Sequence, residues 1–316
     1  MMSFGIDIGG TFIKIVAINE RGKVLKSEKF KTPVQLSHKN FLKFLAGIIK
    51  DWQQKLKVKE TVIGIGIAGD TDNKKGILRF APNIPWHNLK ITSELQKLTG
   101  LKCFASNDAN MAAFGVYKKE LKGKYKNILV LTLGTGIGGG IIIDGKLYQG
   151  ATGTAGEFGH IKVADTKDGN LCACGAHGCL ESYIGTNNLK KLALKFVKEN
   201  PKSILAALLK KEKFSVKILS VAASKRDKSA LLIWEYFGKY LGIGLADLIL
   251  SFNPEAIIFS GGVSGGAKYF IPTLKQVFKE QKIKEPFKNI KVLVSKTKDI
   301  GALGAALYAL SLGNEK

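Results

Sequence analysis

The chain has 316 residues, enough for two domains with a sizeable core, and hydrophobic residues make up 45% of it. No apolar run reaches the ~20 residues that a membrane span needs. The formal charge of +24 suggests nucleic-acid binding, yet arginine, which contacts bases and phosphates best, occurs only at Arg21, Arg79 and Arg226. Because the lysines are scattered over predicted helix surfaces, we expect no specific nucleic-acid partner. The lack of a long apolar run likewise leads us to expect no membrane partner.

The first part of the chain predicts an α/β domain. A strand at 4–8 ends in the glycine turn Gly9-Gly10-Thr11, and strands at 12–18 and 24–30 follow. Apolar residues spaced three and four apart predict a helix over 37–55. Next come a buried strand at 62–68, a short helix at 91–99, a strand at 101–105 that stops at Ser106-Asn107-Asp108, and a helix at 109–118.

The opening pattern then returns, with a strand at 128–133, the turn Gly134-Thr135-Gly136 and a strand at 137–143. This repetition predicts two lobes of similar topology: residues 1–118 with 300–316, and a larger α/β lobe of residues 119–299. Residues 187–250 are expected to be mostly helical. The remaining predicted elements are a strand at 256–260, the turn Gly261-Gly262-Val263, a helix at 265–281, a strand at 290–294, and a small-residue helix from 301 that packs on the N-terminal lobe.

Three of the four cysteines, Cys172, Cys174 and Cys179, lie within eight residues of one another. With the upstream His160 they make a Cys3His set, the pattern of a closed tetrahedral structural zinc site. His177, inside the cluster, is a rival nitrogen ligand. Reduced thiols and a disulfide are the alternatives, although a disulfide leaves one clustered cysteine unpaired and nothing at the N-terminus resembles a secretion signal.

Two acids flank these ligands. Glu157 precedes His160 by three residues, and Glu181 follows Cys179 by two. Held beside a metal-fixed histidine, the two carboxylates could accept hydrogen bonds from a polyol. We therefore expect that loss of the metal weakens polyol binding more than it weakens ATP binding to the glycine turns.

Glycine turns after strands expose successive backbone N–H groups, which can bind phosphate oxygens. Three such turns occur, at residues 9–11, 134–136 and 261–263, and together they predict a polyphosphate held between two lobes. Neither a Gly-Lys-Ser/Thr phosphate loop nor a dinucleotide-binding fingerprint that opens a helix is present.

Several of these motifs together resemble the ROK family, which comprises repressors, open reading frames and sugar kinases. They are Asp7-Ile8-Gly9-Gly10-Thr11, Asn107-Asp108, Leu133-Gly134-Thr135-Gly136, Gly156-Glu157-Phe158-Gly159-His160, Cys172-x-Cys174-x4-Cys179-x-Glu181 and Asn253-Pro254-Glu255 with Gly261-Gly262-Val263. The resemblance covers essentially the whole chain and is strongest to the bacterial glucokinases. It implies the two-lobed actin/hexokinase-like ATPase fold, with duplicated RNase H-like domains and a zinc-binding loop.

The resemblance also implies roles for individual residues. Asp108 matches the general base, although an aspartate at a helix start is more often an N-cap. The sugar contacts implied are Gly69, Asn83, Asn107, Asp108, Glu157, His160 and Glu181. The ATP site implied is Asp7, near magnesium, with Gly9, Gly10, Thr11, Lys14, Gly134, Thr135, Gly136, Gly261 and Gly262. The zinc ligands implied are His160, Cys172, Cys174 and Cys179.

The sequence thus predicts a cytoplasmic hexose kinase that depends on ATP and Mg²⁺ and has glucose as its leading substrate. The kinase is expected to contain Zn²⁺ and to form a homodimer or homotetramer. An N-acetylhexosamine or fructose kinase is the enzymatic alternative. A sugar-sensing transcriptional repressor is the alternative from another class, and it is disfavoured because the first glycine turn follows a strand that begins at residue 4, which leaves no room for a DNA-binding domain ahead of it.

Overall fold

The computed structural model describes residues 1–58 and 60–313 and divides into two compact units. Unit 1 comprises Met1–Val130, Gly140–Gly156 and the segment that begins at Lys296, and unit 2 comprises Leu131–Gly139 and Glu157–Ser295. The predicted lobes, residues 1–118 with 300–316 and residues 119–299, follow from the repeated pattern in the sequence, and they stay a prediction.

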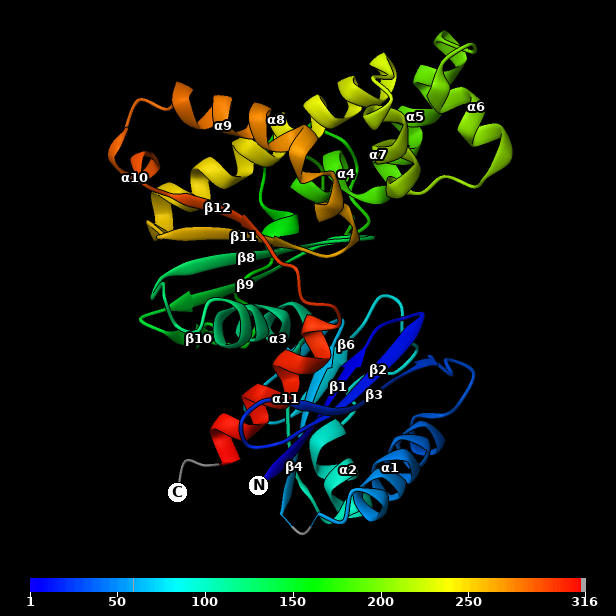
Figure 1. Cartoon of the computed structure of the whole chain (residues 1–316), viewed down its shortest axis with the longest axis vertical. Coiled ribbons are helices and arrows are strands. Elements are labelled where there is room, and N and C mark those ends of the chain that lie inside the picture. The colour runs from blue at the N-terminus through cyan, green and yellow to red at the C-terminus, as the bar shows by residue number, and fades with distance from the viewer. Residues whose placement is uncertain (59, 314–316) are drawn as a thin grey trace. The chain divides into compact units, whose positions relative to one another are not determined.

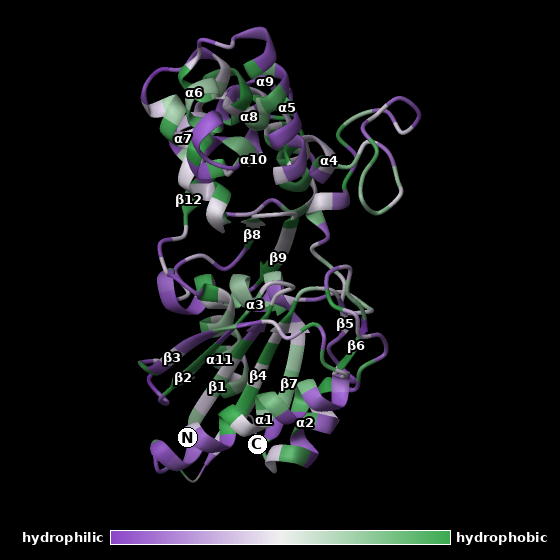
Figure 2. Ribbon diagram, turned by 90° about the vertical axis from the view of Figure 1, so that its right-hand side faces the viewer, coloured by the Kyte–Doolittle hydropathy of each residue, from purple (hydrophilic) through white to green (hydrophobic). Residues whose placement is uncertain are grey.

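Unit 1 is built on a five-stranded sheet of order β3-β2-β1-β4-β7 (Figure 1). Strands β3, β2 and β1 are antiparallel, and β1, β4 and β7 are parallel. The lysine-rich edge strand β3 is drawn mostly in the hydrophilic colour of Figure 2. The elements of this unit are β1 (Met2–Ile8), β2 (Phe12–Ile18), β3 (Val24–Lys31), α1 (His38–Lys55), β4 (Thr61–Ile67), β5 (Asp70–Asp72), β6 (Ile77–Phe80), α2 (Ile91–Thr99), β7 (Lys102–Asn107), α3 (Asp108–Gly115), a π-helical turn (Val116–Glu120), β10 (Lys146–Tyr148) and α11 (Ile300–Gly313).

The two faces of this sheet are covered differently because successive side chains of a strand point to opposite sides. Phe4, Ile6 and Ile8 of β1 belong to a buried cluster with α1 and α2. The opposite face of the sheet packs on α11, and glycines of β1 and β4 lie at the contact. A Cβ on Gly5 of β1 would lie 1.9 Å from the carbonyl oxygen of Ala302, and a Cβ on Gly64 of β4 would lie 1.8 Å from the carbonyl oxygen of Ala305. Figure 1 shows α1 and α2 on one side of the sheet and α11 on the other.

The second five-stranded sheet has the order β10-β9-β8-β11-β12, and like the first it contains an antiparallel hairpin, β9–β10, and a parallel pair, β11–β12. The boundary between the units falls within β8 (Ile128–Leu133) and β9 (Ile137–Ile143). The remaining elements are a 3₁₀ turn (Phe158–His160), α4 (Leu180–Ile184), α5 (Thr186–Glu199), α6 (Ile204–Lys211), α7 (Val216–Ser224), α8 (Lys228–Phe252), β11 (Ala256–Ser260), a 3₁₀ turn (Gly262–Gly266), α9 (Ala267–Glu280), α10 (Glu285–Lys288) and β12 (Lys291–Val294).

Most predicted elements are confirmed to within one or two residues, including the return of α11 onto the first sheet. The hairpin of β5 and β6 was not predicted, because its first strand, Asp70-Thr71-Asp72, is short and polar. The predicted helix at 109–118 is an α-helix only to Gly115 and continues as a π-helical turn. Within the described part of the chain, no helix is both long and apolar enough to cross a membrane.

The close approach of α11 gives a stability prediction. Gly64→Ala should lower the free energy of unfolding by about 1–3 kcal/mol, because the added methyl overlaps the backbone of α11. Gly47→Ala is the matched control: Gly47 lies in α1, where an added Cβ meets nothing within 4 Å, so alanine should stabilise the protein by about 0.5–1 kcal/mol. Thermal and urea unfolding measure both variants. Equal effects of the two substitutions would contradict this packing.

Candidate functional site

The parallel strands of unit 1 end together. In the register of the sheet, Ile8 of β1 lies beside Ile67 of β4, and Ile67 lies beside Asn107 of β7. The glycine turn at 9–11, Gly69 and the pair Asn107-Asp108 therefore leave the sheet at the same edge. The carboxyl edge of parallel strands is where ligands bind in open α/β sheets.

Asn107 and Asp108 begin helix α3 in different ways. Asn107 is the N-cap, since its Oδ1 accepts a hydrogen bond from the N–H of Ala109 at 2.8 Å. Its Nδ2 donates to the carbonyl oxygen of Gly69 at 3.1 Å, which joins the ends of β4 and β7. Asp108 is the first helical residue, and its Oδ1 accepts from the same Ala109 N–H at 2.9 Å. The capping role expected of an isolated aspartate thus lies mainly with Asn107.

Asp7 lies at the end of β1 among several charges. Its Oδ2 is 4.0 Å from Nζ of Lys14, which is 3.1 Å from Oδ1 of Asp299. A Cβ on Gly301, in the first turn of α11, would lie 2.9 Å from the same Oδ2, so the carboxylate of Asp7 packs against the start of that helix. Burial, and then the charge of Asp108, raise the pKa of Asp7 to about 7, against the opposing effect of Lys14. Two carboxylates thus share one charged environment.

Asp108 itself is also shifted. Burial raises the pKa of its carboxyl group, and the N–H of Ala109 partly offsets that rise. A carboxylate with a raised pKa is more basic, and perturbed carboxyls are typical of catalytic sites. This electrostatic feature could not be read from the sequence.

The glycine turn after β1 is held in place by Thr32. The hydroxyl of Thr32 donates to the carbonyl oxygen of Gly9 at 2.6 Å, and its N–H donates to that of Thr11 at 2.9 Å. Gly10 packs so tightly on Asn83 that an added Cβ would lie 2.6 Å from the Cβ of Asn83. The predicted phosphate turn and one predicted sugar contact are therefore neighbours.

The hairpin β5–β6 directly follows Gly69 at this edge of the sheet. It contains Arg79, which the sequence analysis did not assign to the site. The guanidinium of Arg79 pairs with Asp70 and donates to the carbonyl oxygen of Thr152 at 2.7 Å. Gly69, at the start of the hairpin, has a φ of 148° and no room for a side chain beside Phe80. Arg79 thus ties the loop before Glu157 to the hairpin.

In unit 2 the other two glycine turns meet. A Cβ on Gly261, whose φ is 89°, would lie 2.4 Å from the carbonyl oxygen of Leu133, immediately before Gly134. Gly134 and Gly262 have open space where a side chain would be. The ends of β8 and β11 therefore present two glycine turns side by side, as a phosphate-binding edge requires.

Glu181, predicted as a sugar contact, also bonds to one of these turns. Its Oε2 accepts a hydrogen bond from the N–H of Ile137 at 2.8 Å, and a Cβ on Gly136 would lie 2.3 Å from the same oxygen. Thr186, which the sequence analysis did not single out, donates its hydroxyl to the carbonyl oxygen of Gly134 at 2.6 Å. No motif in the sequence indicates this bond.

The four predicted metal ligands come together. One ligand atom from each of His160, Cys172, Cys174 and Cys179 lies within 4.8 Å of every other. Sγ of Cys174 is 3.8 Å from Sγ of Cys179, and Sγ of Cys172 is 3.8 Å from Nδ1 of His160. The cysteines are free thiols, so the disulfide alternative is wrong.

The rival ligand, His177, is not part of this group. Its Nδ1 lies 2.8 Å from the carbonyl oxygen of Gly169. Positive φ angles at Gly175 (87°) and Gly178 (77°) turn the chain so that the three sulfurs meet. Lys162 donates from Nζ to Sγ of Cys179 at 3.1 Å, which places a positive charge beside the thiols.

The two nitrogens of His160 face different neighbours. Nδ1 points to the cysteines, whereas Nε2 lies 3.9 Å from Oε2 of Glu157. The side chains of His160 and Glu157 remain 39% and 54% exposed, so a ligand can reach both. One imidazole can therefore serve a metal and a hydroxyl group at once.

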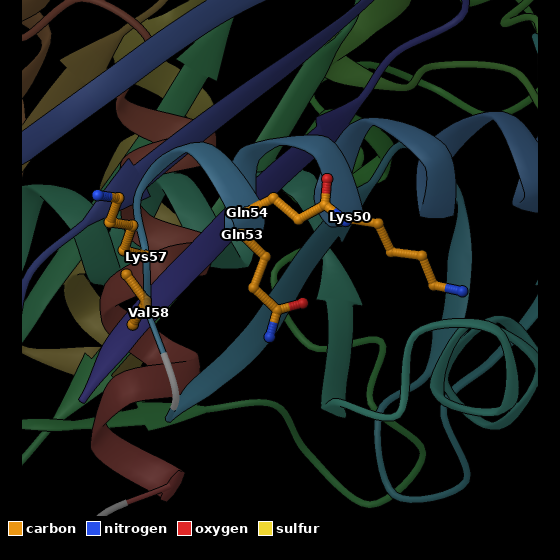
Figure 3. Close-up of a pocket in the computed structure, with 5 residues that line it drawn as sticks. All are labelled: Lys50, Gln53, Gln54, Lys57 and Val58. Atoms are coloured by element: carbon orange, nitrogen blue, oxygen red, sulfur yellow. The ribbon is translucent and has the colours of Figure 1, made fainter.

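A pocket in another part of unit 1 has a different character. It has a volume of about 430 Å³ and is lined by Lys50, Gln53, Gln54, Lys57 and Val58, at the end of α1 (Figure 3). These residues precede β4, at the opposite edge of the sheet from Asn107 and Asp108. None of the predicted site residues lines it, and we assign it no role in the site.

The raised pKa of Asp7 gives a pH prediction. Between about pH 4 and pH 7 the folded chain keeps a proton on Asp7 that the unfolded chain releases, so the stability present at low pH is lost as the pH rises to 7. Asp7→Asn removes this loss, and its advantage in unfolding free energy over the original chain should grow by about 1–3 kcal/mol from pH 5 to pH 8. Denaturant unfolding at both pH values measures it. Asp247→Asn, on the exposed face of α8, is the control; an advantage of Asp7→Asn that does not change with pH would refute the shift.

The sequence and the fold resemble those of known proteins. The model of the ROK family matches residues 3–311. A glucokinase of Thermotoga maritima is 34% identical over 96% of this chain and 95% of its own length, and a xylose repressor of Caldicellulosiruptor bescii is 30% identical over 93% of this chain and 74% of its own length. The crystal structure of a ROK family glucokinase from Streptomyces griseus in complex with glucose and AMPPNP has a TM-score of 0.83 and 33% identity, and covers 98% of this chain and 100% of that one.

These likenesses confirm the predicted actin/hexokinase-like α/β fold. Because the family model extends over nearly the whole chain, this protein belongs to the ROK family.

Proposed function

We propose that this chain is an ATP-dependent hexose kinase that transfers the γ-phosphoryl group of ATP to the primary hydroxyl of a hexose, with glucose as its first substrate. The observation that carries the proposal is the position of Asp108, a carboxyl of raised pKa at the same sheet edge as Asn107, Gly69 and the turn at 9–11. The relatives support it, since they include a glucokinase and a structure with glucose and AMPPNP bound.

Asp108 acts as the general base in this proposal. It accepts the proton of the attacking hydroxyl, and the Ala109 N–H on its Oδ1 holds the carboxylate in one orientation. Asn83 and Asn107, together with Glu157, His160 and Glu181, bind the other hydroxyls of the sugar. Positioning and charge neutralisation supply most of the catalytic effect in phosphoryl transfer.

The glycine turns bind the phosphates of ATP through backbone N–H groups. The Mg²⁺ that accompanies ATP neutralises phosphate charge, and Asp7 in its ionised form, with Lys14 beside it, is the group placed to attract that ion through water. The pKa of about 7 means that magnesium binding would release a proton from Asp7 below neutral pH.

The test is an ADP-release assay with glucose, N-acetylglucosamine and fructose, applied to the original chain and to Asp108→Asn. Glucose should give the highest kcat/KM, and Asp108→Asn should lower kcat by at least ~10²-fold with little change in hexose affinity, because only proton transfer is lost. Asp51→Asn, at an exposed position of α1, is the control. Turnover by Asp108→Asn close to that of the original chain would remove Asp108 from its assigned role.

A sugar-sensing repressor is the second candidate, favoured by the 30% identity with a xylose repressor. The scarcity of arginine argues against direct reading of DNA bases by this chain. Hexose-dependent ADP release decides between the two functions, since a sensor binds sugar without turnover.

We further propose that the Cys3His group holds one Zn²⁺. A tetrahedral zinc with Zn–S bonds near 2.3 Å places its sulfurs about 3.8 Å apart, and Cys174 and Cys179 have that separation between their Sγ atoms. Three thiols and one imidazole are also a donor set that binds zinc in preference to magnesium or calcium, which favour oxygen ligands. Nδ1 of His160 would hold the ion and fix the ring orientation, which would leave Nε2 and Glu157 to receive a sugar hydroxyl.

The two histidines provide a matched test of this metal site. Purified protein should contain about one zinc per chain, because the four ligands form a single closed site. His160→Ala should lose most of the zinc and raise the Kd for glucose, whereas His177→Ala should keep both near their original values. Elemental analysis and calorimetry are the measurements. Zinc lost in His177→Ala and retained in His160→Ala would reverse the ligand assignment.

A further inference from the structure

The turn at Gly134–Gly136 is a short glycine-containing segment that does not hold its shape by its own side chains. Gly134 and Gly136 have none, Thr135 is exposed, and the bond within the turn joins the N–H of Gly134 to the carbonyl oxygen of Gly136 at 3.0 Å. Glycine has the greatest conformational freedom of any residue. A turn that must aim its N–H groups at phosphate therefore needs support from outside.

That support comes from the start of α5. The hydroxyl of Thr186 donates to the carbonyl oxygen of Gly134 at 2.6 Å, and the N–H of Thr186 donates to the carbonyl oxygen of Thr135 at 3.3 Å. One residue thus holds two consecutive carbonyl groups of the turn. Five residues earlier, the Glu181 carboxylate holds the N–H of Ile137, the residue after the turn.

These bonds determine where the N–H groups of the turn point. In a planar trans peptide, the C=O of one residue and the N–H of the next point in opposite directions. Because Thr186 draws the carbonyl groups of Gly134 and Thr135 toward α5, the N–H groups of Thr135 and Gly136 point away from α5. Two successive N–H groups with the same direction form the kind of nest that receives a phosphate oxygen.

We propose that Thr186 is a positioning residue for nucleotide binding, which fixes the turn at 134–136 in the conformation that receives a phosphate of ATP. The inference rests on the proposed kinase function, because that function assigns the turn to ATP. Thr186 itself need not touch the nucleotide. Its hydroxyl acts by orienting the two peptide groups whose N–H groups do.

The hydroxyl of Thr186 has a competing, purely structural explanation. It lies in the first turn of α5, after Gly185 as the N-cap, and could simply steady the start of that helix. The two roles differ in what they affect. A structural role changes unfolding and all kinetic constants together, whereas a positioning role changes nucleotide affinity and leaves hexose affinity and stability near their original values.

The experiment compares Thr186→Val, which removes the hydroxyl and keeps the shape, with Thr186→Ser, which keeps the hydroxyl. For each variant we would measure the Kd for AMPPNP by calorimetry, the KM values for ATP and for the hexose, and the thermal midpoint. Thr186→Val should raise the Kd for AMPPNP and the KM for ATP about fivefold to tenfold, as loss of one hydrogen bond allows. Its hexose KM should stay within about twofold, and Thr186→Ser should restore nucleotide binding.

The matched control is Thr99→Val. It removes a threonine hydroxyl that donates to the carbonyl oxygen of Leu95 at 2.8 Å, in a helix of unit 1. This variant should leave the AMPPNP affinity unchanged. If Thr186→Val does not fold, Thr186→Ala, which needs less space, replaces it.

Three results would overturn the inference: an AMPPNP affinity of Thr186→Val equal to that of the original chain, a loss that Thr186→Ser does not restore, or an original chain that binds no AMPPNP. Failure of the proposed function looks different. In that case the original chain binds AMPPNP and responds to Thr186→Val but releases no ADP with any hexose.

Discussion

Helix α11 approaches β1 and β4 so closely that no side chain fits at Gly5 or Gly64. Gly5 and Gly64 face the carbonyl groups of Ala302 and Ala305, and a methyl at either position would overlap the helix backbone. This contact fixes the start of α11 beside the end of β1, where Gly301 leaves room for the Asp7 carboxylate. Asp7 is therefore buried beside α11, and this burial is the largest cause of its raised pKa.

The raised pKa values of Asp7 and Asp108 are compatible with the phosphoryl transfer that we propose. Both have raised pKa values, chiefly because they are buried, and the charge of Asp108 adds to the shift of Asp7. A base must be basic enough to take a proton from a sugar hydroxyl, yet remain ionised near neutral pH. An acid with a pKa of about 7 is ionised by a nearby cation, so its charge would be fully developed when the phosphates and their magnesium arrive.

The sequence predicted what periodicity and composition determine. The strands, the three glycine turns and the Cys3His group follow from local patterns, and the structure places the metal-binding residues within reach of one another. The choice of His160 over His177 came from the family resemblance and not from local patterns, since both imidazoles lie near the cysteines along the chain. It depends on the direction of the chain after Gly175 and Gly178, which brings the three sulfurs to the Nδ1 side of His160.

The hydrogen bonds between residues far apart in the chain could not be predicted from the sequence either. The hydroxyl of Thr186 bonds to a carbonyl group 52 residues earlier, and the carboxylate of Glu181 bonds to an N–H 44 residues earlier, so that only the tertiary fold brings these groups together. The same is true of Arg79, whose partner Thr152 lies 73 residues away. Glu181 was expected to contact sugar alone, and nothing in its motif indicates the bond to Ile137.

Helix α4 lies in the chain between the Cys3His group and the residues that bond to the turn at 134–136. Cys179, one of the four proposed metal ligands, is its N-cap, Glu181 lies in its first turn, and Thr186 follows its end. The helix is firmly seated, because Leu180 is fully buried and the Tyr183 ring stacks on Tyr240 with centroids 4.3 Å apart. Cys179 is thus separated by only two residues from Glu181 and by seven from Thr186, the two side chains that bond to the segment at 134–137. The sequence led us to expect that loss of a metal here would weaken sugar binding more than ATP binding, and that stays a prediction; the bonds of Glu181 and Thr186 show that the segment after the cysteines also holds the glycine turn proposed to bind ATP.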